Sequence, residues 1–315
     1  MNESEHDSGN DDPDREFVEL MKRHQEAIQE GRMDEADALT QDLFAIAASK
    51  VNENPRPEWA FEEEARNYEA AGDWQAAEAA YRKALELADK ADEAAWQCKA
   101  HSNLKWLLRL VGHRESALKH ARLATELARR TEMSILLAMT LESEASFALD
   151  CSLLSEAFGA IQEAIQIVER DVPDDAVLYG RCLVVRAECL RQSGEFDRAG
   201  ADLESALKKF KPLEAMEFAA GVHGGIAEWW TLKARLLTSL NQGSDILNAW
   251  SRAVASSRHT ASLPQCAGPQ LDNVLATRIW EYGKALSAAG CAEEAEQAFG
   301  ESRGIRNRIG LPPFL

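Results

Sequence analysis

Glycines divide this chain at nearly equal intervals, and this spacing constrains the fold more than any other feature. Counted along the chain, the steps from Gly31 to Gly72 and from Gly72 to Gly112 are 41 and 40. The step from Gly112 to Gly194 is 82, or two steps of 41, and Ser152 lies near its midpoint in a similar turn without a glycine. A period of about 40 residues between helix-like segments predicts an array of helical repeats, in which each repeat packs on its neighbours.

The unit over residues 59–88 has the clearest pattern. Gly72 suits the left-handed conformation that ends a helix, and Asp73 suits the cap of the next helix. Apolar residues then recur every three or four positions, which is typical of one buried helix face. This stripe consists of Trp74, Ala77, Tyr81 and Ala84, and the matching stripe upstream of Phe61, Ala65 and Tyr68.

This pattern resembles the tetratricopeptide repeat, and the other units keep the same frame more loosely through residues 16–308. The resemblance implies an all-α, right-handed α-solenoid of about seven antiparallel helical hairpins. Residues 1–15, with six acids and no Lys or Arg before Arg15, are expected to form a disordered acidic tail, and residues 309–315 a C-terminal tail. The period of 40 to 42 exceeds the about 34 residues of the standard repeat, so longer helices are expected.

Seven helix pairs follow from this frame, with two longer connections at 210–225 and 258–269. A connection of this length is either a harmless insertion or a functional loop. Gly221–Gly225 is expected to be a flexible hinge rather than an anion-binding nest. The expected pairs are 16–29 and 33–50, 57–71 and 75–90, 93–111 and 115–130, 134–150 and 154–170, 175–193 and 196–210, 225–240 and 245–258, and 271–288 and 292–308.

Composition excludes several classes of partner. The net charge of −18, from 53 acids and 35 bases, argues against nucleic-acid binding. No apolar run approaches the about 18 residues of a membrane span, and no signal or transit peptide is evident. The six cysteines are scattered without a C-x-x-C pair, which favours a reducing, cytoplasmic location over a disulfide or metal framework.

The sequence carries no pattern typical of catalysis. Nucleophile-elbow, P-loop, dinucleotide-binding and H-E-x-x-H motifs are absent. None of the seven histidines pairs with another His or with Cys at a metal-ligand spacing. We therefore expect no catalytic residue, no metal and no cofactor.

Basic residues gather on the expected first helices of the middle repeats, although the whole chain is acidic. The helix near 93–111 has no acid between Ala94 and Val111. In the tetratricopeptide family the first helices line the concave groove, so the resemblance implies a peptide-binding set there, with an asparagine for the peptide backbone. This set is Lys99, Asn103, Trp106, Arg109, Arg181, Glu188, Arg191 and Arg235.

Two interpretations of these bases stay open. They form a groove for an acidic segment or a C-terminal carboxylate, or they pair with Glu142, Glu144 and Asp150 on the intervening helix. The acidic N-terminal tail would compete for the same groove. Of the adjacent Trp229 and Trp230, Trp230 is expected to be buried and Trp229 to be a contact residue.

The sequence therefore predicts a non-enzymatic protein-interaction scaffold or adaptor that binds a segment of another protein in its groove. The alternative is a peptide-responsive regulatory sensor, and an enzyme is less favoured. No nucleic acid or membrane partner is expected, and a homo-oligomer is possible. The apolar C-terminal tail is expected to cover the end of the solenoid or to dock on another chain.

Overall fold

The structure is a computed structural model that describes residues 57–214, 220–263 and 268–314, with isolated positions between 20 and 39. The chain divides into two compact units, residues 1–56 with 216–218, and residues 57–215 with 219–315. The predicted acidic tail, and most of the first predicted helix pair (16–29 and 33–50), lie outside the described residues.

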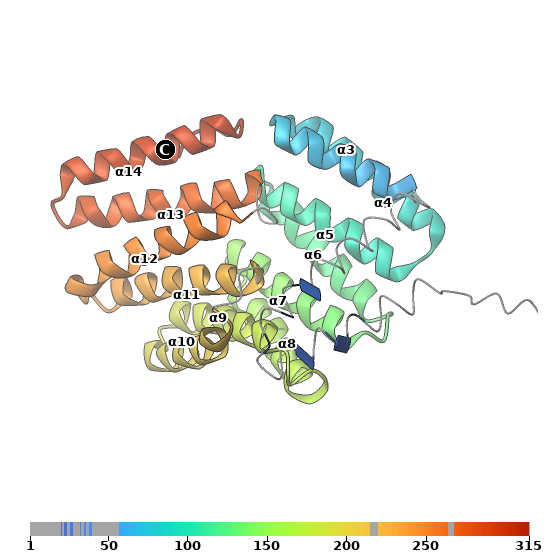
Figure 1. Cartoon of the computed structure of the whole chain (residues 1–315), viewed down its shortest axis with the longest axis horizontal. Helices are drawn as coiled ribbons and strands as arrows, with labels where there is room; N and C mark the ends of the chain where they lie inside the picture. The colour runs from blue at the N-terminus through green and yellow to red at the C-terminus, as the bar shows by residue number, and fades with distance from the viewer. Residues whose placement is uncertain are drawn as a thin grey trace, which may run out of the picture. The chain divides into compact units, whose positions relative to one another are not determined.

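The second unit is built from antiparallel helical hairpins, each joined to the next (Figure 1). The described ranges contain no β-strand, so the expectation of an all-α repeat fold is confirmed. The helices are α3 (Pro57–Ala71), α4 (Trp74–Ala91), α5 (Ala94–Leu110), α6 (Arg114–Ala128), α7 (Ser134–Asp150), α8 (Leu154–Asp171), α9 (Ala176–Gln192), α10 (Phe196–Phe210), α11 (Ala220–Ser239), α12 (Gly243–Ser262), α13 (Pro269–Ala288) and α14 (Ala292–Arg308), with the 3₁₀ turn η1 (Lys211–Leu213) after α10.

The turn inside each described hairpin repeats one backbone conformation. Its central residue has a positive φ in all six of them, at Gly72, Gly112, Ser152, Gly194, Asn241 and Gly290. In the α5–α6 turn the His113 amide donates to the Leu108 carbonyl at 2.8 Å, and in the α7–α8 turn the Leu153 amide donates to the Ala148 carbonyl at 2.9 Å. These bonds close the end of the first helix of each hairpin, and the prediction that Ser152 replaces a turn glycine is confirmed.

Small residues allow the helices to pack closely. Ala77, Ala117, Ala157 and Ala199 have no exposed surface, and each stands at the same place after its turn. Each first helix packs on its own second helix, and from α5 onward also on the second helix of the preceding hairpin, while α9 contacts α7 and α11 directly as well. The core therefore extends along the array through contacts between neighbouring hairpins.

Both predicted long connections are shorter in the structure. The helix α11 begins at Ala220 rather than near 225, and α12 continues to Ser262 rather than ending near 258. The predicted hinge at Gly221–Gly225 is wrong, because these residues form the first turns of α11. Gly225 is needed for packing: a Cβ there would lie 2.6 Å from the Phe210 ring, which is fully buried.

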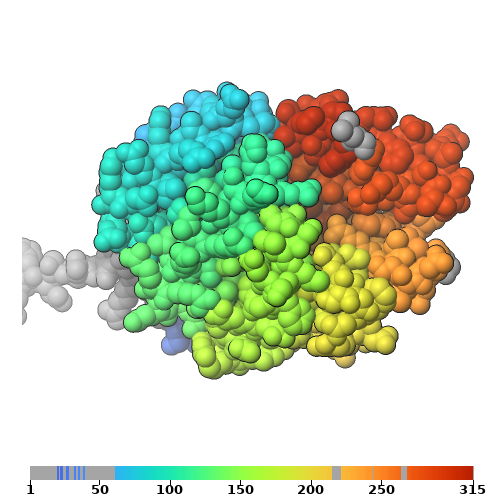
Figure 2. Space-filling model, turned by 180° about the vertical axis from the view of Figure 1, so that it is seen from behind, coloured from blue at the N-terminus to red at the C-terminus, as the bar shows by residue number. Residues whose placement is uncertain are grey.

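The last hairpin also contacts the first described one, where residues 309–311 reach the α3–α4 turn. The Trp74 indole donates to the Gly310 carbonyl at 3.3 Å. Ile309 and Leu311 are buried in a cluster with Leu110 and Trp74. In Figure 2 the cyan surface of α3–α4 meets the red surface of the C-terminal hairpin. The C-terminal tail thus covers part of this unit, as one of the two sequence-based interpretations proposes.

Candidate functional site

Two rows of residues run across consecutive first helices at matched distances from the turns. Thirteen positions before the turn residue stand Lys99, Met139, Arg181 and Glu228, on α5, α7, α9 and α11. Six positions before it stand Trp106, Ser146, Glu188 and Arg235. Residues seven apart share a helix face, so the two rows form one surface, named here the inner rows.

Ion pairs join the first helices of neighbouring hairpins beside the inner rows. Lys99 Nζ lies 2.7 Å from Glu62 on α3, and Arg109 Nε lies 2.7 Å from Asp150 on α7. Arg181 on α9 lies 2.6 Å from Glu142. The Glu62 and Glu142 side chains are buried, so an attached cation limits their desolvation cost.

These contacts decide between the two sequence-based interpretations of the basic residues. Arg109 and Arg181 already hold Asp150 and Glu142, so the pairing interpretation is confirmed for both. Arg191 holds Glu188 on its own helix at 2.8 Å, and its guanidinium also donates to Ser239 on α11 at 3.1 Å. Among the described residues no ion pair joins Lys105 or Glu144 to a partner within 4 Å.

The structure brings the remaining predicted residues onto the same surface. Trp106 is 37% exposed and packs edge-on against Phe147. Asn103 has an enclosed side-chain nitrogen, Nδ2, without a hydrogen-bond partner. Arg235 is exposed, and no ion pair joins it to another described residue.

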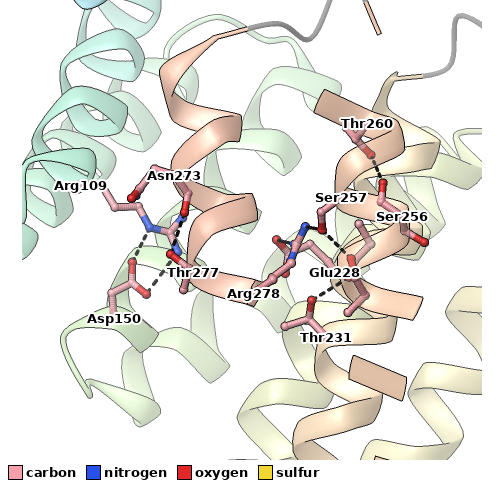
Figure 3. A network of polar contacts seen from close by, with 12 residues as sticks. Arg109, Asp150, Glu228, Thr231, Ser256, Ser257, Thr260, Asn273, Thr277 and Arg278 are labelled. Carbon is pink, nitrogen blue, oxygen red and sulfur yellow. Dashed lines mark hydrogen bonds and ion pairs between the residues drawn. The ribbon is translucent and has the colours of Figure 1, made fainter. Parts of the chain in front are cut away.

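A buried arginine on α13 was missed by sequence reasoning. The Arg278 guanidinium lies 2.5 Å from Glu228 on α11, donates to the Ser257 hydroxyl at 2.6 Å, and is almost fully buried (Figure 3). Burial lowers its pKa from the usual value. Figure 3 also places Arg109 and Asp150 beside Asn273 of α13, because α13 contacts α5. Sequence spacing gave no signal for either contact.

The assignment of the two tryptophans is reversed. Trp229 is buried and its indole donates to the Leu203 carbonyl on α10 at 2.5 Å. Trp230 is the partly exposed residue, with the Arg252 guanidinium 4.8 Å from its ring. The prediction of Trp229 as a contact residue is therefore wrong, because the close packing of α11 on α10 buries it.

Two histidine pairs form across distant sequence positions, which the local spacing did not indicate. His101 and His120 approach to 2.7 Å between their Nδ1 atoms, and the His223 and His259 rings lie 4.6 Å apart. Burial lowers the pKa of His120 to about 4. Within the described ranges, no group of three or more His, Cys, Asp or Glu side chains is arranged to hold a metal ion.

The fold is a helical repeat solenoid of tetratricopeptide-like hairpins. No protein-family model matches the chain, and no curated protein is significantly similar to it in sequence. In the described ranges no helix is long and apolar enough to span a membrane.

Several solved structures share this fold. A Rap protein complexed with competence and sporulation factor is 15% identical with a TM-score of 0.60, over 93% of this chain and 76% of that one. Aspartyl phosphate phosphatase F from Bacillus subtilis is 14% identical with a TM-score of 0.53, over 98% and 88%. BtubC from P. vanneervenii is 20% identical with a TM-score of 0.51, over 76% and 93%. At these identities the likeness shows the fold alone.

Proposed function

We propose that this protein is a non-enzymatic interaction scaffold that binds a segment of another protein along the inner rows. The observation that carries the proposal is the exposed Trp106, held by Phe147 on a surface that spans several hairpins. Aromatic side chains of this kind are favoured at the centres of binding sites. Asn103 lies on the same helix face as Trp106, and its enclosed and unpartnered Nδ2 would have to turn outward to donate to a backbone carbonyl of the bound segment.

The ion pairs beside the inner rows favour a preorganised surface. Side chains such as Arg181 and Lys99 are held by Glu142 and Glu62, so a ligand would not have to order them. Because most of the arginines hold carboxylates already, the bound segment is recognised mainly by Trp106, Met139 and Asn103. The carboxylate-binding role first expected of Arg109, Arg181 and Arg191 is correspondingly reduced.

Display of random peptides against the purified full chain tests this proposal, with binding of the selected peptides measured by fluorescence anisotropy. The variant Trp106→Ala/Arg235→Glu removes two exposed residues of the inner rows and should weaken binding by about tenfold or more. The matched control is Leu153→Ala/Arg252→Glu, which changes an equally exposed apolar residue and an arginine outside the inner rows. Equal binding by both folded variants would contradict the proposal.

The alternative, a peptide-responsive regulatory sensor, is favoured by one comparison. A Rap protein of the same fold is known as a complex with competence and sporulation factor. A sensor would change its conformation on binding, whereas a scaffold with a preformed surface would change little. Small-angle X-ray scattering of the chain with and without a selected peptide distinguishes the two.

A further inference from the structure

The last hairpin meets the first two described hairpins along a contact that is named here the seam. On one side lie residues 309–311, which follow the end of α14, and Gln270 at the start of α13. On the other side lie the α3–α4 turn and Leu110 at the end of α5. Gly72 and Gly310 both have positive φ, and a Cβ on Gly310 would lie 3.3 Å from the Gly72 carbonyl oxygen. The seam therefore fits two helix ends closely against each other.

The polar contacts across the seam are weak. The Trp74 indole donates to the Gly310 carbonyl at 3.3 Å, and the Gln270 amide donates to the Glu69 carboxylate at 3.5 Å. Both distances exceed the about 3.0 Å that is usual for such hydrogen bonds. Glu69 is 6% exposed and burial raises its pKa, so its hydration in an open seam would offset the loss of the Gln270 bond. Opening the seam therefore costs little in hydrogen bonding.

The apolar part of the seam adjoins the inner rows. Ile309 and Leu311 form a small buried cluster with Leu110, and Trp74 packs against it. Leu110 stands four residues after Trp106 on α5, so the two side chains lie on one helix face, one turn apart. Trp106 is 37% exposed, whereas Leu110 is only 8% exposed. The seam therefore covers the surface one helical turn beyond Trp106.

The residues on the C-terminal side of the seam are joined to one another. The Arg306 guanidinium on α14 donates to the Pro312 carbonyl and to the Asn273 side chain on α13, each at 2.5 Å. In Figure 3 Asn273 lies beside the pair of Arg109 and Asp150, and α13 contacts α5. Because Arg306 ties α14 to the start of α13 and to the C-terminal segment, these parts would move away from α5 as one body.

We propose that the seam opens and closes, and that its opening extends the inner rows for the bound segment. This inference rests on the proposed function and concerns the regulation of the same site. Opening would expose Leu110, Ile309 and Leu311 beside Trp106, so a segment with apolar side chains beyond its Trp106 contact binds the open form more tightly. A ligand shifts such an equilibrium by its difference in affinity for the two forms. The closed seam is then the resting state, and an apolar segment is the partner that opens it.

Three variants test the seam. Leu311→Asp places a carboxylate in the apolar cluster of the closed seam and should favour the open form, because a buried charge without a partner is costly. Gly310→Asn and Gly290→Asn form a milder matched pair, since both glycines have a positive φ that Asn tolerates. A Cβ on Gly290 meets open space, whereas one on Gly310 meets the Gly72 carbonyl. Circular dichroism checks that each variant keeps its helices.

Two measurements follow the seam and the binding separately. The state of the seam is read from the indole N–H resonance of Trp74 in a chain labelled with ¹⁵N-tryptophan, a resonance identified by its loss in Trp74→Phe. Binding is measured by fluorescence anisotropy, with display-selected peptides whose affinity is reduced by Trp106→Ala/Arg235→Glu.

We expect Leu311→Asp to shift the Trp74 resonance and to bind these peptides about tenfold more tightly than wild type, because the open form is no longer the minor population. Peptide added to wild type should shift the resonance in the same direction. Gly310→Asn should bind the peptides more tightly than wild type by a smaller factor, and Gly290→Asn should bind them as wild type does.

Several results would overturn the inference. If Leu311→Asp shifts the Trp74 resonance but does not bind the peptides more tightly, the seam does not control the site and the proposed function stands. A resonance that stays in place in both Leu311→Asp and Gly310→Asn would show that the seam does not open. If Leu311→Asp loses its helices, equal affinities of the two Asn variants overturn the inference alone. If display yields no peptide for wild type or for Leu311→Asp, the proposed function falls and the inference falls with it.

Discussion

The hairpins α5–α6 and α7–α8 are neighbours with the same register but different interiors. His101, Lys105 and His120 of the first correspond to Leu141, Ala145 and Ala160 of the second, each one repeat later in the chain. The two turns share corresponding backbone hydrogen bonds, and the central residue of each, Gly112 or Ser152, is left-handed. The backbone frame is therefore compatible with either interior, so the polar residues of α5–α6 are not required by the fold.

Because the hairpins share one frame, each position in one hairpin can be compared with the equivalent position in the others. A buried polar residue is costly unless it is paired, and His101 and His120 pair with each other, at 2.7 Å. Lys105 remains without such a partner among the described residues. The comparison thus separates a polar contact that is satisfied within the protein from a buried amine without such a partner among the described residues.

The largest expected effect comes from placing the lysine in the wrong hairpin. Ala145 has no exposed surface, so Ala145→Lys should lower the free energy of unfolding by about 3 kcal/mol or more through overpacking and an unpaired charge. Ser146→Lys, the next position along the same helix and partly exposed, should cost less than about 0.5 kcal/mol. Urea unfolding of both variants provides the measurement. Equal tolerance of the two lysines would remove the distinction between the hairpins.

Exchanging the turn residues probes what the two hairpins share. Gly112 has φ +91° with open space around a Cβ, so Gly112→Ser should cost about 1 kcal/mol for backbone conformation alone. Ser152 has φ +60°, and Ser152→Gly should gain less than that, because the unfolded chain also becomes more flexible. Thermal unfolding of both variants checks the opposite signs. A loss of stability in Ser152→Gly would show that the serine side chain contributes to this turn.

The smallest effect concerns pH and the histidine pair. Because burial lowers the folded pKa of His120 to about 4 from the usual value near 6.5, the unfolded chain binds more protons in this window. Stability is therefore full above pH 6.5 and falls as the pH drops toward 4. The variant His101→Leu/His120→Ala, which copies α7–α8, should gain stability relative to wild type between pH 7.5 and pH 5, on the order of 1 kcal/mol after solvent screening.

Denaturant titrations of wild type and this double variant at both pH values give the difference directly. Titration of carboxylates elsewhere affects both proteins alike and cancels. A difference in stability that does not change with pH would mean that the histidine pair takes up its proton as readily in the folded protein as in the unfolded chain.

Local features were predictable from the sequence, whereas contacts between distant residues were not. The turns at Gly72, Gly112 and Gly194 were predictable because a left-handed residue and an apolar stripe lie within a few positions of each other. The pairing of Arg109 with Asp150 was open, since it depends on the rotation of two helices in different hairpins. The roles of Trp229 and Trp230 were predicted the wrong way round for the same reason, because a small rotation of the helix decides which of the two is buried.

Part of the candidate site could have been found with a different comparison. Lys105 was visible as one of several bases on its helix, and only alignment on the turn residue reveals that the other described hairpins carry Ala or Gly there. Arg278 gave no such signal, because its partners Glu228 and Ser257 belong to two different preceding helices. Whether a base is paired is a property of the packed helices and not of its own segment.

The contact between Trp74 and Gly310 changes how this unit can unfold. In an open repeat array the terminal units have one neighbour each and can unravel singly. Here a contact between residues 236 positions apart gives the α3–α4 hairpin a further neighbour. The contact is costly in loop-closure entropy and so belongs to the late stage of folding. Once it has formed, the two ends lose their independence, and opening at either end carries the free-energy cost of releasing the other.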